Sequence, residues 1–184
     1  MRLRRAATAD AAAIAAIYAP YVTDTAVTFD TSPPDAATIA ERMAGAADLY
    51  PWLVACDAEG VVAGYAYASQ FRPRAAYRFA VETTVYLAKG RGGAGIGTAL
   101  YTALLDLLTA QGFRQAISAI TLPNPPSVAL HERMGFVAVG RYPQVGWKLG
   151  AWHDVGLWQR RLATGDDPPV EPKPYPPFWS DRFL

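Results

Sequence analysis

The sequence is poor in the residues that build disulfides and metal sites. Its 184 residues include one cysteine, Cys56, and two histidines. A single thiol cannot form an intramolecular disulfide, and it excludes a cysteine-cluster metal site. Cys56 lies in the alternating segment WLVACDAEG, which predicts a buried strand residue; a reactive thiol is the alternative. We expect no bound metal.

An excess of charge of one sign is also lacking. The 17 Lys and Arg residues nearly balance the 16 Asp and Glu residues, so no uniform positive field draws the chain onto nucleic acid or anionic membranes. No run reaches the length of an uninterrupted membrane-spanning helix. Asp10, Tyr18 and Pro20 interrupt the Ala-rich N-terminal segment, which argues against a signal peptide. We therefore expect a cytoplasmic protein with neither nucleic acid nor membrane as partner.

The sequence does have enough apolar residues, 52%, for one substantial core, in a chain short for two domains. Residues 1–162 are expected to form this domain. From residue 163 the composition changes to TGDDPPVEPKPYPPFWSDRFL, in which the prolines exclude a helix or a central strand. Residues 163–184 thus form a tail, either disordered or anchored on the domain or on a second subunit by its aromatic side chains, Tyr175, Phe178, Trp179 and Phe183.

Helix and strand patterns alternate along residues 1–162 and predict an α/β (α+β) fold. Helices are expected over residues 8–22, 35–47, 96–111 and 128–134. Strands are expected over residues 2–7, over the two arms of a hairpin about residues 57–60, over 79–87 and 115–120, and over two final strands about a turn near residues 143–150.

The most informative feature is the strand FAVETTVYL running into the glycine-rich segment KGRGGAGIGTALYTALLDLLTAQG. Glycines let backbone N–H groups approach an anion closely, and a helix that begins there adds the positive end of its dipole. The alternative is a tight turn with no ligand, but that needs fewer glycines than the five present, Gly90, Gly92, Gly93, Gly95 and Gly97. We interpret the segment as a phosphate site.

Two common phosphate sites are excluded by the residues beyond this turn. Gly90, Gly92 and Gly95 match the dinucleotide pattern G-x-G-x-x-G, but the next strand, QAISAI, lacks the acid that holds a ribose. No Lys-Ser or Lys-Thr pair comes after the glycines, so a P-loop is excluded as well. A cofactor whose diphosphate is held mostly by main chain remains, and coenzyme A fits that description.

At this point the chain resembles the GNAT superfamily of N-acetyltransferases, and within it the phosphinothricin and methionine sulfoximine acetyltransferases. The resemblance covers residues 2–162 and is carried by IYAPYV, TAVTFDT, RAAYRFAVETTVYL, GAGIGTALYTALL, LPNPPSVALHERMGF and WHDVGLWQ. It implies a mixed sheet of about six or seven strands, splayed at the acyl-CoA site and flanked by about four helices. It also implies acetyl-CoA as co-substrate and a homodimer. One departure is Gly92, which stands where the superfamily pattern has Gln or Arg; Arg91 and Lys89 lie nearby.

The resemblance also implies the cofactor-binding residues. The main chain of Val85, Tyr86 and Leu87 would pair with the pantetheine arm as an added strand. Asn124 would hold the pantetheine arm, although an Asn between prolines is also an ordinary turn former. The diphosphate would rest on Gly93, Ala94, Gly95, Ile96, Gly97 and Thr98.

Acetyl transfer to an amine needs a base for the ammonium proton and an acid for the departing thiolate. Glu82 lies in an apolar strand, where an unpaired carboxylate is costly to bury, and is the candidate base; a solvent-facing Glu or an internal ion pair is the alternative. His131 stands where many GNAT enzymes have a tyrosine, and is the candidate acid or a proton relay with Glu82; a packed histidine is the alternative. His153 is expected to brace the last strands.

By the same resemblance, RPRAAY faces the acceptor with Arg72, Arg74 and Tyr77, and guanidinium groups suit a carboxylate. Thr28 and Phe29 would close the pocket from the other side, and either Thr83 or Thr84 would face it. The expected reaction is direct attack, in a ternary complex, by the α-amino group of a small amino-acid-like acceptor. A protein N-terminus or a polyamine as acceptor, and a non-catalytic acyl-CoA-binding module, are the alternatives.

Overall fold

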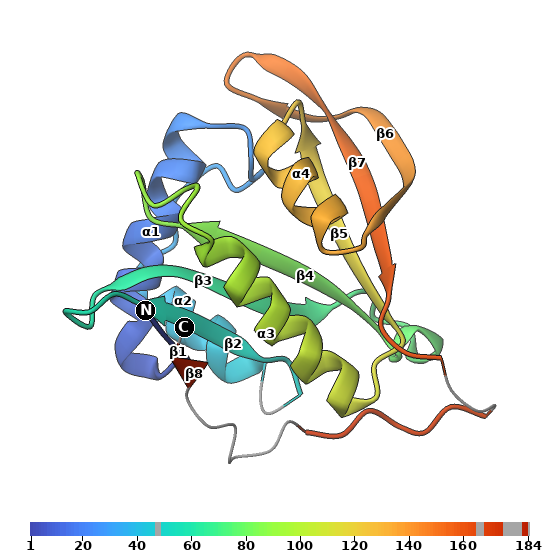
Figure 1. Ribbon diagram of the computed structural model, residues 1–184. Coiled ribbons are helices and arrows are strands. Elements are labelled where there is room, and N and C mark those ends of the chain that lie inside the picture. The colour runs from blue at the N-terminus through green and yellow to red at the C-terminus, as the bar shows by residue number, and fades with distance from the viewer. Residues whose placement is uncertain (47–48, 165–167, 175–181, 184) are drawn as a thin grey trace.

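The computed structural model describes residues 1–46, 49–164 and 168–174, and the backbone of 182–183. Of the tail's aromatic residues, Tyr175, Phe178 and Trp179 and the side chain of Phe183 lie outside the described part. Figure 1 shows the domain, with residues 168–174 of the tail near the C-terminal end of α3 and residues 182–183 beside β1.

One mixed sheet forms the centre of the molecule. Its strand order is β6-β7-β5-β4-β3-β2-β1-β8, in which β4 and β5 are parallel and the other neighbours antiparallel. The strands are β1 (Arg2–Arg5), β2 (Trp52–Cys56), β3 (Val62–Gln70), β4 (Ala80–Leu87), β5 (Gln115–Leu122), β6 (Val137–Lys148), β7 (Ala151–Arg161) and β8 (Arg182–Phe183). The domain contributes seven strands, as predicted, and the tail adds the short β8 at the β1 edge.

Four α-helices cover the sheet, also as predicted. They are α1 (Ala11–Asp24), α2 (Ala36–Gly45), α3 (Ile96–Gln111) and α4 (Pro125–Arg133), with short 3-10 turns η1 (Thr8–Asp10) and η2 (Ala75–Tyr77). Helix α4 begins three residues earlier than expected. Asn124 accepts a hydrogen bond from the Ser127 amide at 3.3 Å as the N-cap, and proline is tolerated in a first helical turn.

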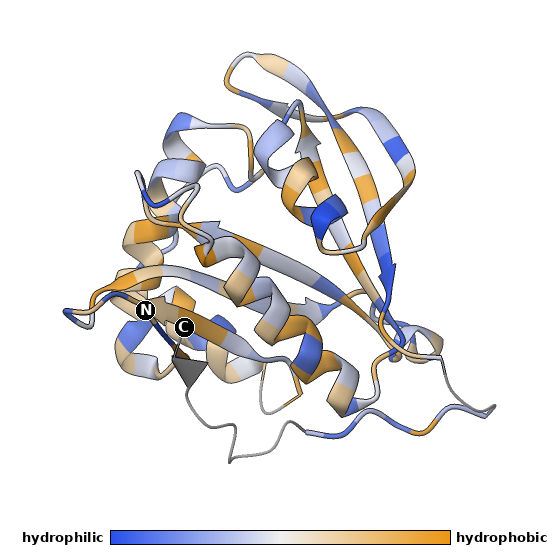
Figure 2. Cartoon of the chain, in the orientation of Figure 1, coloured by the Kyte–Doolittle hydropathy of each residue, from blue (hydrophilic) through white to orange (hydrophobic). Residues whose placement is uncertain are grey.

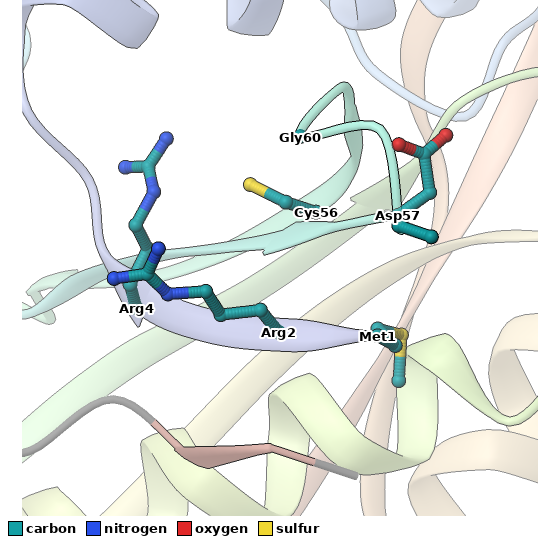
Figure 3. A pocket seen from close by; sticks show the side chains of 7 residues that line it. Met1, Arg2, Arg4, Cys56, Asp57 and Gly60 are labelled. Atoms are coloured by element: carbon teal, nitrogen blue, oxygen red, sulfur yellow. The ribbon is translucent and has the colours of Figure 1, made fainter.

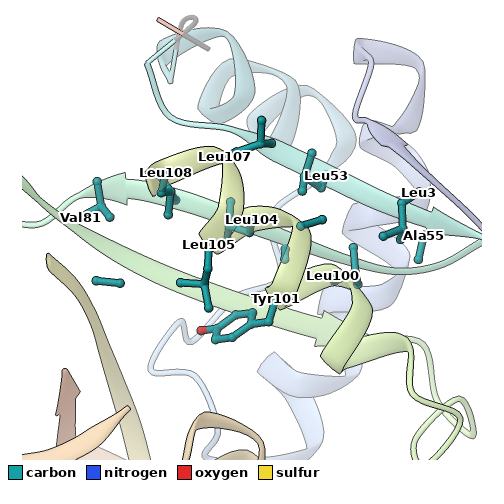
Figure 4. Close-up of a cluster of buried hydrophobic side chains, with 14 of the residues drawn as sticks. Leu3, Leu53, Ala55, Val81, Leu100, Tyr101, Leu104, Leu105, Leu107 and Leu108 are labelled. Carbon is teal, nitrogen blue, oxygen red and sulfur yellow. The ribbon is translucent and has the colours of Figure 1, made fainter. Parts of the chain in front are cut away.

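The sheet separates two apolar cores. On one face α3 buries Leu100, Leu104 and Leu108 against the middle strands (Figure 4). On the other face α1 and α2 pack residues such as Ile14 and Ile39 against β2 and β3. Figure 2 shows apolar stretches along α3 and the middle strands, and the hydrophilic β2–β3 turn at the far left, away from α3. Amphipathic helices therefore enclose a sheet buried on both faces.

The final hairpin turns at the end of the predicted range, residues 143–150. Strand β6 continues through Pro143 to Lys148, and the turn is Leu149–Gly150, in which Gly150 has φ 75°. The register shifts between Tyr142 and Gly146, so the proline falls in a bulge. Because β6 is the outermost strand of the sheet, a proline there leaves no ladder partner unpaired.

The feature that positions the site is the separation of β4 from β5. Only residues Ala80–Glu82 of β4 pair with residues Gln115–Ile117 of β5. Both strands continue beyond this paired part, β4 to Leu87 and β5 to Leu122. Beyond Glu82 the edge of β4 that faces β5 is free of ladder pairing. The sheet is therefore splayed beside the glycine-rich turn, as the resemblance implied.

Candidate functional site

A cavity of about 50 Å³ lies where β4 and β5 part. It is lined by residues 83–86 of β4, residues 118–121 of β5, Asn124, Ser127 and His131 of the α4 segment, and Val27. Two strands, one helix and the loop after α1 thus converge on this opening in the sheet. Val85, Tyr86, Asn124 and His131, all predicted site residues, therefore line one cavity, whereas Glu82 and the glycine-rich turn lie outside its lining.

Side chains of β4 alternate between the two faces of the sheet at this opening. Tyr86 contacts the rings of Tyr18 and Tyr21 on α1, at centroid distances of 5.0 and 4.9 Å. Thr83 lies on the other face, with its hydroxyl 3.2 Å from that of Tyr101 on α3. Alternation therefore puts Glu82 on the α1 face with Tyr86.

Glu82 has the electrostatics of a candidate base. Burial raises the pKa of its carboxyl group, and the positive charge of Arg72 opposes that rise. The structure therefore brings Arg72 into range of Glu82. Thr84 lies on the same face, so of the two threonines it is the one beside Glu82, whereas Thr83 is packed and only 3% exposed.

His131 is buried and its two ring nitrogens have different partners. Nδ1 lies 2.7 Å from the carbonyl oxygen of Ser127, which can only accept, so Nδ1 carries a proton. Nε2 lies 2.8 Å from the Tyr101 hydroxyl and accepts its hydrogen in the neutral ring. Burial lowers the pKa of His131, which favours that neutral form.

The Tyr101 hydroxyl joins a buried polar group. It lies 3.2 Å from the hydroxyls of both Thr83 and Ser118, and burial raises its pKa to about 12. His131 contacts this group on the α3 side, while Glu82 faces α1. Among the described contacts none joins His131 directly to Glu82, so a relay between them stays a prediction.

The glycine-rich turn has the backbone of an anion cradle. Gly90, Gly93 and Gly95 have φ angles of 80°, 80° and 78°, which side-chain-bearing residues rarely adopt, and Gly95 is the N-cap of α3. The first amides of α3, from Ile96 to Thr98, have no carbonyl one turn earlier in the helix to bind, so they are donors for an anion. This fits the diphosphate of coenzyme A.

Two glycines of this segment behave differently from the others. Gly92 has no positive φ, and a Cβ there would meet open space, so the conformation does not require glycine. Its neighbour Arg91 directs its guanidinium to Asp57 in the β2–β3 turn, at 2.8 Å. Gly97 is buried and lets α3 approach Leu130 of α4, because a Cβ there would lie 3.3 Å from that side chain. The role of Gly97 therefore includes packing.

Asn124 has the turn-forming role considered for it, and it also lies at the site. Its side-chain oxygen caps α4 at the Ser127 amide, and the residue lines the cavity between β4 and β5. The cap uses the oxygen and leaves the amide N–H groups for a further acceptor. Asn124 is therefore a helix cap with a donor to spare at the site.

The loop after α1 contacts both α1 and the final hairpin. The Thr28 hydroxyl lies 2.5 Å from the Tyr18 hydroxyl. The backbone carbonyl of Thr28 accepts a hydrogen bond from Lys148 Nζ at 2.7 Å. The Phe29 ring rests on Gly146 of β6, where an added Cβ would overlap it. Thr28 and Phe29 therefore join the loop to the final hairpin.

His153 has the bracing role predicted for it: its Nε2 donates to the Lys148 carbonyl at 2.9 Å, across the β6–β7 turn. Arg74 and Tyr77, by contrast, are exposed at the η2 turn. Tyr77 contacts the ring of Phe71 at 5.7 Å. Arg72 is exposed too, but its charge acts on the pKa of Glu82, and no such effect is found for Arg74 among the described residues.

Sequence reasoning missed three residues of the site. In the sequence, Tyr101 looks like one of several apolar residues on the helix that follows the glycines. Ser118 looks like an ordinary strand residue. Lys148 is 7% exposed, and burial lowers its pKa while Asp30 opposes the shift. A lysine within an apolar strand is an available signal, since burying its charge is costly.

A larger cavity, of about 450 Å³, lies at the β1–β2 edge and is lined in part by Arg2, Arg4 and Cys56 (Figure 3). Arg4 binds Asp10 there at 2.6 Å. Cys56 is 3% exposed, as predicted for a buried strand residue. In the described part of the chain, no three His, Cys, Asp or Glu residues are grouped as metal ligands, and no helix has the length and apolarity to cross a membrane.

Comparison with known proteins agrees with this geometry. The family model for the acetyltransferase (GNAT) domain matches residues 3–157. A phosphinothricin N-acetyltransferase of Streptomyces viridochromogenes is 42% identical over 96% of this chain and 94% of its own. An L-methionine sulfoximine/L-methionine sulfone acetyltransferase of Pseudomonas paraeruginosa is 39% identical over 87% of this chain and 94% of its own length.

The fold is also that of a solved structure with a bound acetyl donor. A GNAT superfamily phosphinothricin acetyltransferase from Sinorhizobium meliloti, in complex with AcCoA, superposes with a TM-score of 0.87 at 42% identity. The match covers 93% of this chain and 92% of that one.

Proposed function

Because the chain belongs to the GNAT family of acetyltransferases, we propose that it transfers the acetyl group of acetyl-CoA to the α-amino group of a small amino-acid-like acceptor. The observation that carries the proposal is the end of β4–β5 pairing at Glu82, next to the glycine-rich start of α3. One region then has a free strand edge, an anion cradle and a half-buried carboxylate.

Each part of acetyl-CoA has a matching group on the chain. The unpaired edge of β4, at Val85–Leu87, suits the amides of the pantetheine arm. The amides of Gly93–Thr98 suit the diphosphate, and Asn124 has amide N–H groups free for the arm. Acetyl-CoA supplies the activated acetyl group.

Glu82 is the base in this proposal, because its carboxylate can take a proton from the acceptor's ammonium group and leave a nucleophilic amine. The amine then attacks the acetyl carbonyl directly, without an acyl-enzyme. His131 and Tyr101 lie on the opposite face, and their joined hydrogen bonds can return a proton to the departing sulfur. The two proton transfers are thus assigned to opposite faces of β4.

The charges around the opening favour an acceptor with a carboxylate. Arg72 lies within electrostatic range of Glu82, and Lys148 is buried under the Thr28 loop. Two cations repel a polyamine but attract an amino-acid carboxylate. The names of the relatives, phosphinothricin and methionine sulfoximine acetyltransferases, describe acceptors of this kind.

The test is release of free coenzyme A thiol from acetyl-CoA by purified protein with different acceptors. Phosphinothricin, methionine sulfoximine and methionine sulfone should be turned over, and spermidine and a peptide with a free N-terminus should not. Turnover confined to the peptide or spermidine would overturn the acceptor class. Absence of turnover with all five, together with measurable acetyl-CoA binding in calorimetry, would instead support a non-catalytic binding module.

We also propose that two copies associate through the β6–β7 hairpin, within the cytoplasm. Large apolar side chains gather there on the surface: Val137, Val139, Val145, Trp147, Leu149 and Trp152. Trp147 and Trp152 are more than half exposed and in contact with each other. A patch of this kind favours association with another surface.

Trp147→Asp should therefore halve the mass measured by light scattering. Val61→Asp, which changes an equally exposed valine beyond the β2–β3 turn, should leave the mass unchanged. A monomeric wild-type protein would contradict the proposed association.

A further inference from the structure

The acceptor loop, residues 71–79, is contacted from outside by the tail. Arg78, at the end of this loop, places its Nε 2.8 Å from both carboxylate oxygens of Glu171. Its Nη2 lies 2.7 Å from the same carboxylate. The guanidinium also donates to the Ala75 carbonyl and covers the Phe79 ring at 4.4 Å. The carboxylate of Glu171 in the tail therefore binds Arg78, which also contacts other residues of the loop.

Glu171 is itself held in place by its neighbours in the tail. The amide of Lys173 donates to the carbonyl of Gln111 at 2.8 Å. The side-chain nitrogen of Gln111 donates back to the Lys173 carbonyl at 2.9 Å. Gln111 ends α3 and is 3% exposed. This reciprocal pair fixes the tail to the C-terminal end of α3, two residues from Glu171.

Most of the loop makes local contacts. The amide of Tyr77 binds the Arg74 carbonyl at 3.0 Å, and that of Arg78 binds the Ala75 carbonyl at 3.2 Å. The Arg72 guanidinium lies over the neighbouring Phe71 ring at 5.2 Å. Among the described contacts, only the end next to β4 is fixed on the sheet, because the Phe79 carbonyl accepts from the Arg114 amide at 2.8 Å. Attachment to α3 through the tail adds a second fixed point, at Arg78.

We propose that Glu171 is a positioning residue for the acceptor site: through Arg78 it holds the loop that carries Arg72 at the distance from Glu82 that an acceptor requires. This inference rests on the proposed function, because it assigns the loop to acceptor binding. It predicts that loss of the contact weakens acceptor binding and leaves the acetyl-CoA site, at the other end of β4, unaffected.

The first measurement is steady-state kinetics of Glu171→Gln. Because the pair is exposed, the expected rise in acceptor KM is about two- to fivefold, with the KM for acetyl-CoA unchanged. Glu59→Gln is the matched control: it removes one exposed carboxylate, in the β2–β3 turn, and should change neither constant. An equal rise in both KM values for Glu171→Gln would overturn the proposal.

The second measurement reverses the pair. Arg78→Glu alone should raise the acceptor KM as Glu171→Gln does, and Arg78→Glu with Glu171→Arg should restore most of the loss, since the two sites are coupled. Additive losses in the double variant would overturn the pairing.

A third measurement does not depend on enzyme activity. Amide hydrogen exchange of the unliganded protein should be faster in residues 72–79 of Glu171→Gln than in the wild type, and unchanged in β4. Unchanged exchange in the loop would overturn the positioning role even if the enzyme is active. A wild type that acetylates no amino acid, with faster loop exchange in the variant, would overturn the acceptor assignment and leave the tail contact established.

Discussion

The hydroxyl of Tyr101 donates a hydrogen bond to Nε2 of His131 over 2.8 Å, between the middle of α3 and the last turn of α4. The sequence suggested a different partner for His131, the carboxylate of Glu82. With Nδ1 engaged by Ser127, the histidine presents no free N–H toward the opening between β4 and β5. The hydroxyl of Tyr101 is therefore part of any proton path through His131.

Tyr101→Phe should lower kcat by about 10²-fold, because general-acid contributions are of this order. The variant should also lose about 1–3 kcal/mol of unfolding free energy, since Nε2 of His131 is left buried without a partner. Rates and urea denaturation measure the two effects. Tyr50→Phe, which alters a half-buried tyrosine stacked on Phe113, should change neither appreciably.

His131→Phe should lower kcat to a similar extent without weakening acetyl-CoA binding. The double variant with Tyr101→Phe should be little slower than either single one, since both remove the same hydrogen bond. Multiplicative losses would show that the two residues act separately.

The pH dependence of kcat/KM should report Glu82. A base works when ionised, and burial raises the pKa of Glu82 above 4.5, so activity should fall as the pH drops through that raised value. Arg72 lowers this pKa, so Arg72→Ala should move the acidic limb to higher pH. A limb that stays in place or moves to lower pH would contradict the electrostatic link.

Glu82→Gln should lower kcat by about 10²- to 10⁴-fold and still bind acetyl-CoA. Its stability provides a check on folding. A raised pKa in the folded state means that ionisation destabilises the fold as the pH rises through that pKa. The variant should therefore gain Tm relative to wild type at neutral pH, and the gain should vanish below pH 4.5.

Asn124 can be divided into its two roles by substitution. Asn124→Asp keeps the capping oxygen and should retain the stability of the fold, whereas Asn124→Ala should lose about 1 kcal/mol. Both remove the amide N–H groups, so both should weaken acetyl-CoA binding in calorimetry. Binding retained by the Asp variant would assign Asn124 to the cap alone.

Gly146→Ala should displace Phe29 and raise the acceptor KM, because the added methyl group overlaps the ring. The KM for acetyl-CoA should not change. Gly140→Ala is the control on the same strand, since a Cβ there meets only Leu157, at 3.9 Å, an ordinary contact. Equal kinetics for the two variants would remove Phe29 from the acceptor pocket.

The parts of the fold and site that the sequence predicts are those set by neighbours along the chain. The order of elements, the glycine turn and the position of Glu82 follow from alternation and turn residues within one strand-turn-helix unit. The hairpin turn lies within the predicted range, but the continuation of β6 through Pro143 was not predicted, because a proline normally ends a strand and is permitted here by the position of β6 at the sheet edge.

Pairings between distant segments could not be predicted from the sequence. Tyr101 and His131 are 30 residues apart, and Lys148 is 120 residues from the Thr28 carbonyl that it binds. The periodic pattern of apolar residues predicts that Tyr101 is buried in the core. It does not predict which helix carries the hydrogen-bond partner of its hydroxyl. The attachment of the tail likewise depends on where α3 ends in space.

The two ends of the sheet differ in a way that bears on self-assembly. Arg182–Phe183 of β8 pair with Arg2 and Leu3, so the chain covers the start of its own β1 edge. An uncovered edge strand can recruit further molecules without limit. In the association proposed through the β6–β7 hairpin, one end of the sheet meets a second copy and the chain itself shields part of the other, an arrangement that favours a closed pair over growth into fibrous aggregates.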